Sequence, residues 1–232
     1  MVQQLLDVTP DLPRWVELRS LLLAGSAVVH GQPGGYVVRG TGWRAGLLVA
    51  VGEPPIHVIR EAARSSPGAN LLAVPESHRH IAAMLGRPGV RARILRLREE
   101  RLPADLSGVR FLSAADGCLL ERVPDPLRDE LLLALRHVPI AAAFVDGRPV
   151  SFCYPSSITE TLWDVSIDTL EPFRRRGLAG LAVAAMTAHM RRLGREPVWG
   201  AADDNPSSLA LARKLGFEVV DHLFVFSSLE DQ

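Results

Sequence analysis

The chain has 232 residues, 47% of them hydrophobic, and its formal net charge at pH 7 is zero. This length predicts one large or two small domains, and this composition can bury a sizeable core. The balanced charge argues against a protein that binds nucleic acid or anionic membrane surfaces, since such proteins usually carry a basic excess.

The cysteines and the first residues bear on metal binding and location. Cys118 and Cys153 are the two cysteines of the chain, too few for a four-cysteine zinc site or a disulfide framework. The start lacks the basic segment of a signal peptide, and the apolar stretch 21–30 is too short to span a bilayer. Lys214 is the only lysine, an arginine bias typical of a GC-rich, bacterial-like genome. We therefore expect a soluble cytoplasmic protein without a metal site.

The first half of the chain predicts an α/β layer pattern. Asp11 and Pro13 are typical of a helix start, and apolar residues from Trp15 to Val29 follow at roughly helical spacing. Later apolar runs predict the strands 36–39, 47–51, 70–74 and 92–97 and the helices 54–64 and 76–85. This half contains no catalytic or phosphate-binding motif that we can name.

A charged, turn-rich segment, residues 98–108, follows the last of these strands. Segments of this kind are typical of domain boundaries. We therefore predict an N-terminal α/β region over residues 1–107 and a second domain over residues 108–232.

The second domain predicts strands and helices in alternation. Asp146-Gly147 is typical of a tight hairpin turn, and Gly194 and Gly216 each follow the end of an expected helix. The expected strands are 109–112, 139–145, 150–154, 162–169, 197–201 and 217–226, and the expected helices are 126–136, 178–193 and 205–215.

The segment Arg174-Arg175-Arg176-Gly177-Leu178-Ala179-Gly180 follows an expected strand and opens a long apolar helix. Glycine lets backbone N–H groups approach a ligand closely, and the first turn of a helix offers unpaired donors and a positive dipole end. Arginines add charge and fork-shaped donors. The segment predicts a pyrophosphate site, with a solvated arginine cluster as the alternative. Its spacing matches neither the dinucleotide fingerprint nor the P-loop.

Two landmarks in this domain resemble the GNAT acetyltransferases. Their signature, Arg/Gln-x-x-Gly-x-Gly/Ala between the fourth strand and the third helix, is matched by Arg174-x-x-Gly177-x-Ala179. Their second landmark, an asparagine before an apolar helix that ends in Lys-x-Gly-Phe, is matched by Asn205 and by Lys214-Leu-Gly216-Phe217. The resemblance is clear over residues 162–225 and extends back to residue 109. It implies a mixed, mostly antiparallel sheet flanked by helices.

The resemblance also implies a site for acetyl-coenzyme A (acetyl-CoA). In this family the fourth and fifth strands part, and the pantetheine arm of the cosubstrate pairs with free backbone groups of the fourth strand. Asn205, before Pro206, is also a good helix N-cap. The residues in matching positions for cosubstrate binding are Ile167, Asp168, Thr169, Arg174, Arg175, Arg176, Gly177, Leu178, Ala179, Gly180, Asn205 and Ser208.

Acetyl transfer to an amine requires a group that takes the amine proton. Asp164 and Asp168 alternate along one expected strand, so they share a face and are the first candidates for this base. A salt bridge or a turn cap is the alternative role for either residue. Glu160 and His137 are further candidates, and Tyr154 is a candidate for lining the acceptor cleft or for packing.

The departing thiolate needs a proton, which many family members supply from a tyrosine on the last helix. The matching position here is Ala212, and Ser208 or a water is the candidate substitute. We predict an enzyme, a GNAT-type N-acetyltransferase. It would move an acetyl group from acetyl-CoA to a primary amine of a small molecule by direct attack in a ternary complex. The alternative is a non-catalytic acyl-CoA sensor or regulatory module.

Partners follow from the same resemblance. A peptide or protein amine is the second choice of acceptor, and we expect no nucleic acid and no membrane partner. The N-terminal region could be a degenerate copy of the same fold, a cover over the acceptor site, or an oligomerisation surface, so a homodimer is one expectation.

Overall fold

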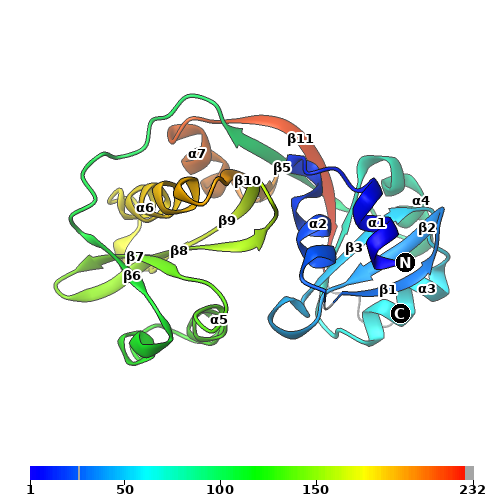
Figure 1. Ribbon diagram of the computed structural model, residues 1–232, viewed down its shortest axis with the longest axis horizontal. Helices are drawn as coiled ribbons and strands as arrows, with labels where there is room; N and C mark the ends of the chain where they lie inside the picture. The colour runs from blue at the N-terminus through cyan, green and yellow to red at the C-terminus, as the bar shows by residue number, and fades with distance from the viewer. Residues whose placement is uncertain (26, 228–232) are drawn as a thin grey trace. The chain divides into compact units, whose positions relative to one another are not determined.

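The computed structural model describes residues 1–25 and 27–227. Its contacts group the chain into two compact units (Figure 1). The first unit holds Met1–Arg96, Gly200–Ala210 and the residues from Val219 onward, and the second holds Leu97–Trp199 and Leu211–Glu218. The sequence patterns do not predict that C-terminal segments join the first unit. The domain ranges 1–107 and 108–232 stay a prediction.

The first unit is a mixed α/β layer. Its strands are β1 (Val28–Gln32), β2 (Gly35–Arg39), β3 (Leu47–Gly52), β4 (Asn70–Ala73), β5 (Val90–Leu97) and most of β11 (Phe217–Phe226). Its helices are α1 (Val2–Val8), α2 (Val16–Leu23), α3 (Ile56–Arg64) and α4 (Pro75–Leu85). The strand order is β1-β2-β3-β4-β11-β5. The β3–β4 pair is parallel, whereas β1–β2, β2–β3 and β4–β11 are antiparallel.

Helices cover both faces of this sheet because its strands are apolar on both sides. Val37 and its same-face neighbours pack with α3 and α4, whereas Val38 and its neighbours pack with α1 and α2. The prediction of one helical stripe from Trp15 to Val29 is wrong at its end. Helix α2 ends at Leu23, Gly25 takes a positive φ of 66°, and Val29 lies in β1. The glycine ends the helix because a left-handed residue cannot continue it.

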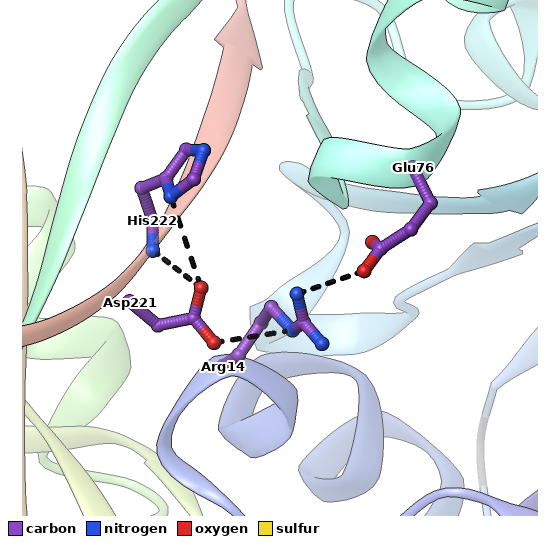
Figure 2. Close-up of polar contacts among 4 residues, drawn as sticks. All are labelled: Arg14, Glu76, Asp221 and His222. Atoms are coloured by element: carbon purple, nitrogen blue, oxygen red, sulfur yellow. Dashed lines mark hydrogen bonds and ion pairs between the residues drawn. The ribbon is translucent and has the colours of Figure 1, made fainter.

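Arg14 connects three segments of the first unit (Figure 2). It lies in the 3-10 helix η1 (Pro13–Trp15). Its Nη1 is 3.1 Å from Glu76 Oε1 at the start of α4, and its Nε is 3.4 Å from Asp221 Oδ2 on β11. The Arg14 side chain is only 23% exposed, so solvent and salt screen these ion pairs less than they would on an open surface.

The second unit confirms the expected mixed, mostly antiparallel sheet. Its strands are β6 (Val109–Leu112), β7 (Ile140–Val145), β8 (Arg148–Ile158), β9 (Leu162–Thr169) and the start of β10 (Glu196–Ala202). Its helices are α5 (Leu127–Ala134), α6 (Leu178–Arg192) and the end of α7 (Pro206–Lys214), with the 3-10 helices η3 (Ala114–Leu120) and η4 (Glu171–Phe173). The order is β10-β9-β8-β7-β6, and only β9–β10 is parallel.

Helices α6 and α5 lie on opposite sides of this sheet (Figure 1). Helix α6 packs on β7, β8 and β9. Its buried residues are mostly small, among them Gly180, Ala182 and Ala184, so its backbone can approach the strands closely. A helix buried over much of its circumference is held rigidly, and this fixes the loop that precedes it.

Gly216 closes the second unit by a close backbone approach. It has a φ of +95°, and a Cβ placed there would lie 1.5 Å from the carbonyl oxygen of Glu99. Its own carbonyl oxygen accepts from the Arg98 N–H at 3.1 Å. Only glycine meets both conditions, which accounts for the glycine after the last helix in structural terms.

We expect Gly216→Ala to destabilise the protein well beyond Gly194→Ala. Gly194 also has a positive φ, of +76°, but a Cβ there would meet nothing within 4 Å. The control therefore carries only the backbone strain, of order 1–3 kcal/mol, whereas Gly216→Ala adds a clash with Glu99. Urea unfolding midpoints measure the difference. Equal midpoints would mean that the close approach to Glu99 relaxes without penalty.

Candidate functional site

Strand β9 is paired on both sides only over its first residues. Against β10, the register runs from Glu196 opposite Leu162 to Val198 opposite Asp164. Against β8, the register continues to Ser151 opposite Thr169. In the described part of the second unit, β9 therefore leaves β10 after Asp164 and keeps only β8 as a partner.

The outward backbone groups of this part of β9 can be assigned. The Leu170 N–H donates to the Val150 carbonyl at 2.9 Å. Opposite residues in an antiparallel pair alternate between those that bond to each other and those that do not. Asp168 and Ser166 therefore bond to β8, whereas Thr169 and Ile167 direct their N–H and C=O groups away from it. These two residues are among those that the resemblance selects.

The loop between β9 and α6 turns through two left-handed residues. Arg175 has a φ of +60° and Gly177, the N-cap of α6, a φ of +83°. The first intrahelical bond is from the Leu181 N–H to the Gly177 carbonyl, at 3.3 Å. The preceding N–H groups, those of 178–180, therefore have no acceptor within the helix. A Cβ on Gly177 would meet nothing within 4 Å, so these donors lie beside open space.

Three exposed arginines surround these donors. The Arg174 Nε donates to the Thr169 carbonyl at 3.1 Å, which ties the loop to the end of β9. The Arg176 guanidinium lies over the Phe173 ring, 5.5 Å from its centroid. Within the described residues, Arg174, Arg175 and Arg176 form no salt bridge. The loop thus combines exposed positive charge with a helix N-terminus, an arrangement suited to a phosphate or pyrophosphate.

Asp168 lies on the opposite face of the sheet from α6. It stands opposite Phe152, and Ser166 stands opposite Tyr154, so these four side chains share one face. Burial and the nearby charge of Glu130 raise the pKa of Asp168, while Arg174 lowers it. In the described part of the chain, the Asp168 carboxylate accepts no hydrogen bond, so its oxygens are available to a ligand.

Tyr154 and Glu130 meet beside Asp168. The Tyr154 hydroxyl donates to Glu130 Oε1, and the tyrosine is only 4% exposed. Burial and the Glu130 carboxylate raise the pKa of Tyr154, so the hydroxyl stays protonated and acts as a donor. Sequence patterns could not identify Glu130, because it lies at an exposed helix position far from Tyr154 in the chain.

The other base candidates are placed differently. The Asp164 carboxylate accepts from the Ser156 hydroxyl at 2.6 Å, so a neighbour already occupies it. Glu160 is exposed beside the β8–β9 turn, and His137 is exposed after α5. Of the four candidates, Asp168 is thus the half-buried one whose carboxylate accepts no hydrogen bond in the described part of the chain, and its role as a base stays a prediction.

Asn205 and Ser208 begin helix α7. The Ser208 N–H donates to Asn205 Oδ1 at 3.1 Å, so Asn205 caps the helix, as its place before Pro206 predicts. Both residues belong to the first unit, and their contact with a cosubstrate stays a prediction. Ala212, where the family's tyrosine would stand, is fully buried.

Two features of the described residues bear on metal binding and on membrane spanning. No group of three or more His, Cys, Asp or Glu side chains is arranged to hold a metal ion there. Within the same residues, no helix combines the length and apolar character needed to cross a bilayer.

Comparisons with known proteins agree with this geometry. The GNAT acetyltransferase family model matches residues 141–226. No curated protein matches the sequence. A GCN5-related N-acetyltransferase-like protein from Streptococcus suis is 18% identical, with 98% of each chain covered and a TM-score of 0.67. A GCN5-related N-acetyltransferase from Kribbella flavida is 19% identical, with 94% of this chain and 95% of that chain covered and a TM-score of 0.61.

A tandem GNAT protein of the clavulanic acid biosynthesis pathway is also similar, with 15% identity, 97% of this chain and 93% of that chain covered, and a TM-score of 0.54. At such identities the solved structures establish the fold, here over nearly the whole chain. Residues 141–226, which carry most of the site described above, thus match the GNAT acetyltransferase family.

We expect Asp168→Asn to raise the melting temperature at neutral pH. The folded state raises the pKa of Asp168, so it binds this proton more tightly than the unfolded chain does. Ionised Asp168 therefore destabilises the fold above the ordinary aspartate pKa, about 3.9. The gain in Asp168→Asn should shrink as the pH falls towards about 4, and thermal melts across this range measure it.

Asp203→Asn is the control, for which we expect a change in melting temperature of opposite sign. Hydrogen bonds from Arg93 and Arg91 lower the pKa of Asp203, so its ionised form stabilises the fold at neutral pH and its removal should lower the melting temperature. A loss of stability in Asp168→Asn near pH 7 would contradict the dominance of burial and of Glu130 at this carboxylate.

Proposed function

We propose that the protein transfers an acetyl group from acetyl-CoA to a primary amine, first of all that of a small molecule. The observation that carries this proposal is the edge of β9, which leaves β10 after Asp164 and leads into the arginine-rich loop at the start of α6. An extended arm with amide groups can pair with such an edge, and a pyrophosphate can bind such a loop.

The residues of the second unit fit this cosubstrate. Ile167 would offer the pantetheine arm its outward N–H and C=O and Thr169 its outward N–H, since the Thr169 carbonyl already accepts from Arg174. The N–H groups of Leu178, Ala179 and Gly180, with the turn at Gly177, would hold the pyrophosphate, and the three arginines before Gly177 would add positive charge. Asn205 and Ser208 remain proposed cosubstrate contacts on the strength of the resemblance alone.

Asp168 is the proposed base. An acceptor enters as an ammonium, and its proton passes to the Asp168 carboxylate, directly or through a water. The neutral nitrogen attacks the thioester carbonyl carbon and the new C–N bond forms. The C–S bond then breaks, and the second proton of the nitrogen passes to a water or to the departing thiolate. Asp164 could relay the proton instead, but Ser156 already donates to its carboxylate.

The thiolate has no tyrosine acid beside it, because Ala212 is buried at the matching position. A free thiol of the cysteine type has a pKa of about 8.5, so the thiolate can leave without a dedicated acid, and a water or the Ser208 hydroxyl would stabilise it by a hydrogen bond. The same alanine favours a second candidate function, a module that binds acyl-CoA without transferring the acyl group. Turnover with an amine separates the two functions.

Of the three possibilities for the N-terminal region, we favour the first, a degenerate copy of the same fold. The similar tandem GNAT protein supports a proposal in which residues 1–107 derive from a second copy of the fold. A peptide or protein amine remains the second choice of acceptor. A homodimer and a cytoplasmic location also remain predictions.

We expect acetyl-CoA to raise the melting temperature of the wild-type protein. A ligand that binds only the folded state at ~100 times its dissociation constant adds about 2.7 kcal/mol. Gly177→Glu should abolish the shift, since it places a carboxylate and a strained residue among the phosphate-binding donors. Differential scanning fluorimetry with acetyl-CoA, with CoA and with neither measures this effect.

Gly147→Glu is the matched control. Gly147 lies in the β7–β8 turn with a φ of +74°, and its Cβ would also meet nothing within 4 Å. It should lose stability like Gly177→Glu but keep the ligand-induced shift. If well-folded wild-type protein shows no shift at millimolar acetyl-CoA, the transferase and the sensor are both ruled out. A shift followed by thiol release in a primary-amine screen supports the transferase, and a shift without release supports the sensor.

A further inference from the structure

Glu130 is the charged group of α5 that contacts the proposed acceptor face. Its carboxylate accepts the hydrogen bond of the Tyr154 hydroxyl. The neighbouring Asp129 instead lies 3.8 Å from the Arg128 guanidinium and has a 71% exposed side chain. Two adjacent carboxylates of one helix thus have different surroundings, and only Glu130 is bound to a buried residue of the sheet.

Tyr154 connects Glu130 to the strand that carries Asp168. Tyr154 stands opposite Ser166, so Asp168 is its diagonal neighbour on the same face. Diagonal neighbours across an antiparallel pair lie ~7–8 Å apart, within reach of an aromatic side chain. The tyrosine is almost fully buried, which fixes the place of its hydroxyl, and this hydroxyl holds the carboxylate of the exposed Glu130.

Three charged or titratable groups face the Asp168 carboxylate. Besides burial, Glu130 on α5 raises the pKa of Asp168 and Arg174 in the loop before α6 lowers it, whereas Tyr154 on β8, whose own pKa is raised, stays neutral. No hydrogen-bond donor within the described chain holds Asp168 in its ionised form. The charge of Glu130 is therefore the main fixed negative charge that this carboxylate experiences.

We propose that Glu130 is a positioning residue of the acceptor site: the Tyr154 hydroxyl holds its carboxylate beside the face that carries Asp168, where its negative charge acts on the base and attracts the acceptor ammonium. The inference rests on the proposed function, since it assigns a role within that reaction. The proton balance is unchanged: the ammonium loses one proton and Asp168 gains it. Glu130 gains none and forms no bond to the acceptor nitrogen.

The physical reason is that Asp168 takes a proton from an ammonium more readily when its own proton affinity is closer to that of the amine. An ordinary aspartate is a weak base toward an ammonium, and a neighbouring negative charge strengthens it. The same charge lowers the energy of a bound cation, which favours amine acceptors over neutral alcohols or acids. A purely structural Tyr154–Glu130 contact would stabilise the packing of α5 but would leave the titration of Asp168 unchanged.

The test compares Glu130→Gln with Asp129→Asn. Glutamine keeps the acceptor for the Tyr154 hydroxyl and removes the charge, while the control removes an equal charge one residue away. Carboxyl-carbon NMR titration of protein labelled at aspartate, with the Asp168 resonance assigned by its loss in Asp168→Asn, gives the Asp168 pKa without any acceptor. We expect this pKa to fall in Glu130→Gln and to stay at the wild-type value in Asp129→Asn.

Kinetics with a primary amine from the acceptor screen give the second readout. In Glu130→Gln, the acid limb of the pH profile of kcat/KM should move to lower pH and the KM for the amine should rise. Asp168→Asn should lower kcat by roughly 100-fold or more. Tyr154→Phe should move the acid limb in the same direction as Glu130→Gln, because the carboxylate then loses its anchor.

The outcomes separate the two levels of the hypothesis. Wild-type protein that binds no acetyl-CoA overturns the proposed function itself. Wild-type turnover with an unchanged acid limb in Glu130→Gln overturns only the role of Glu130. An Asp168 pKa that is equal in wild type and Glu130→Gln overturns it as well, even without turnover. A fall specific to Glu130→Gln supports it.

Discussion

The backbone hydrogen bonds of β9 are the constraint on which the rest of the site depends. Peptide N–H and C=O groups in a folded protein need partners, and a strand within a sheet normally finds them on both sides. Here β10 supplies partners only as far as Asp164. The outward N–H and C=O of Ile167 and the outward N–H of Thr169 lie beyond that point, so this part of β9 has backbone groups that no neighbouring strand pairs.

The elements around this edge keep it rigid and charged. Helix α6 is held against β7, β8 and β9 by small buried residues, so its first N–H groups have a fixed direction. Arg174 returns from the loop to the Thr169 carbonyl and links the two parts. A backbone edge for an extended arm and a helix N-terminus for a phosphate thus come from one continuous segment, which is why a short sequence motif could identify them.

The sequence predicted best where chemistry is local. The turn at Asp146-Gly147, the loop before α6 and the capping role of Asn205 each depend on residues close together in the chain, and glycine, proline and asparagine have strong local preferences. The prediction that a helical stripe continues to Val29 was wrong, because it gave the apolar spacing more weight than Gly25, which ends the helix. The joining of C-terminal segments to the first unit could not be foreseen, since it depends on long-range strand pairing.

Glu130 shows the same limit within the site. No sequence pattern distinguishes Glu130 from the neighbouring Asp129. Glu130 differs only through the fold, in which Tyr154, diagonal to Asp168 in the strand register, donates to its carboxylate. Backbone binding of a cosubstrate tolerates sequence change, because any residue provides N–H and C=O groups. Recognition of an acceptor depends on side chains brought together from separate elements. The cosubstrate site could therefore be predicted from a motif, whereas the acceptor side chains could be identified only from the fold.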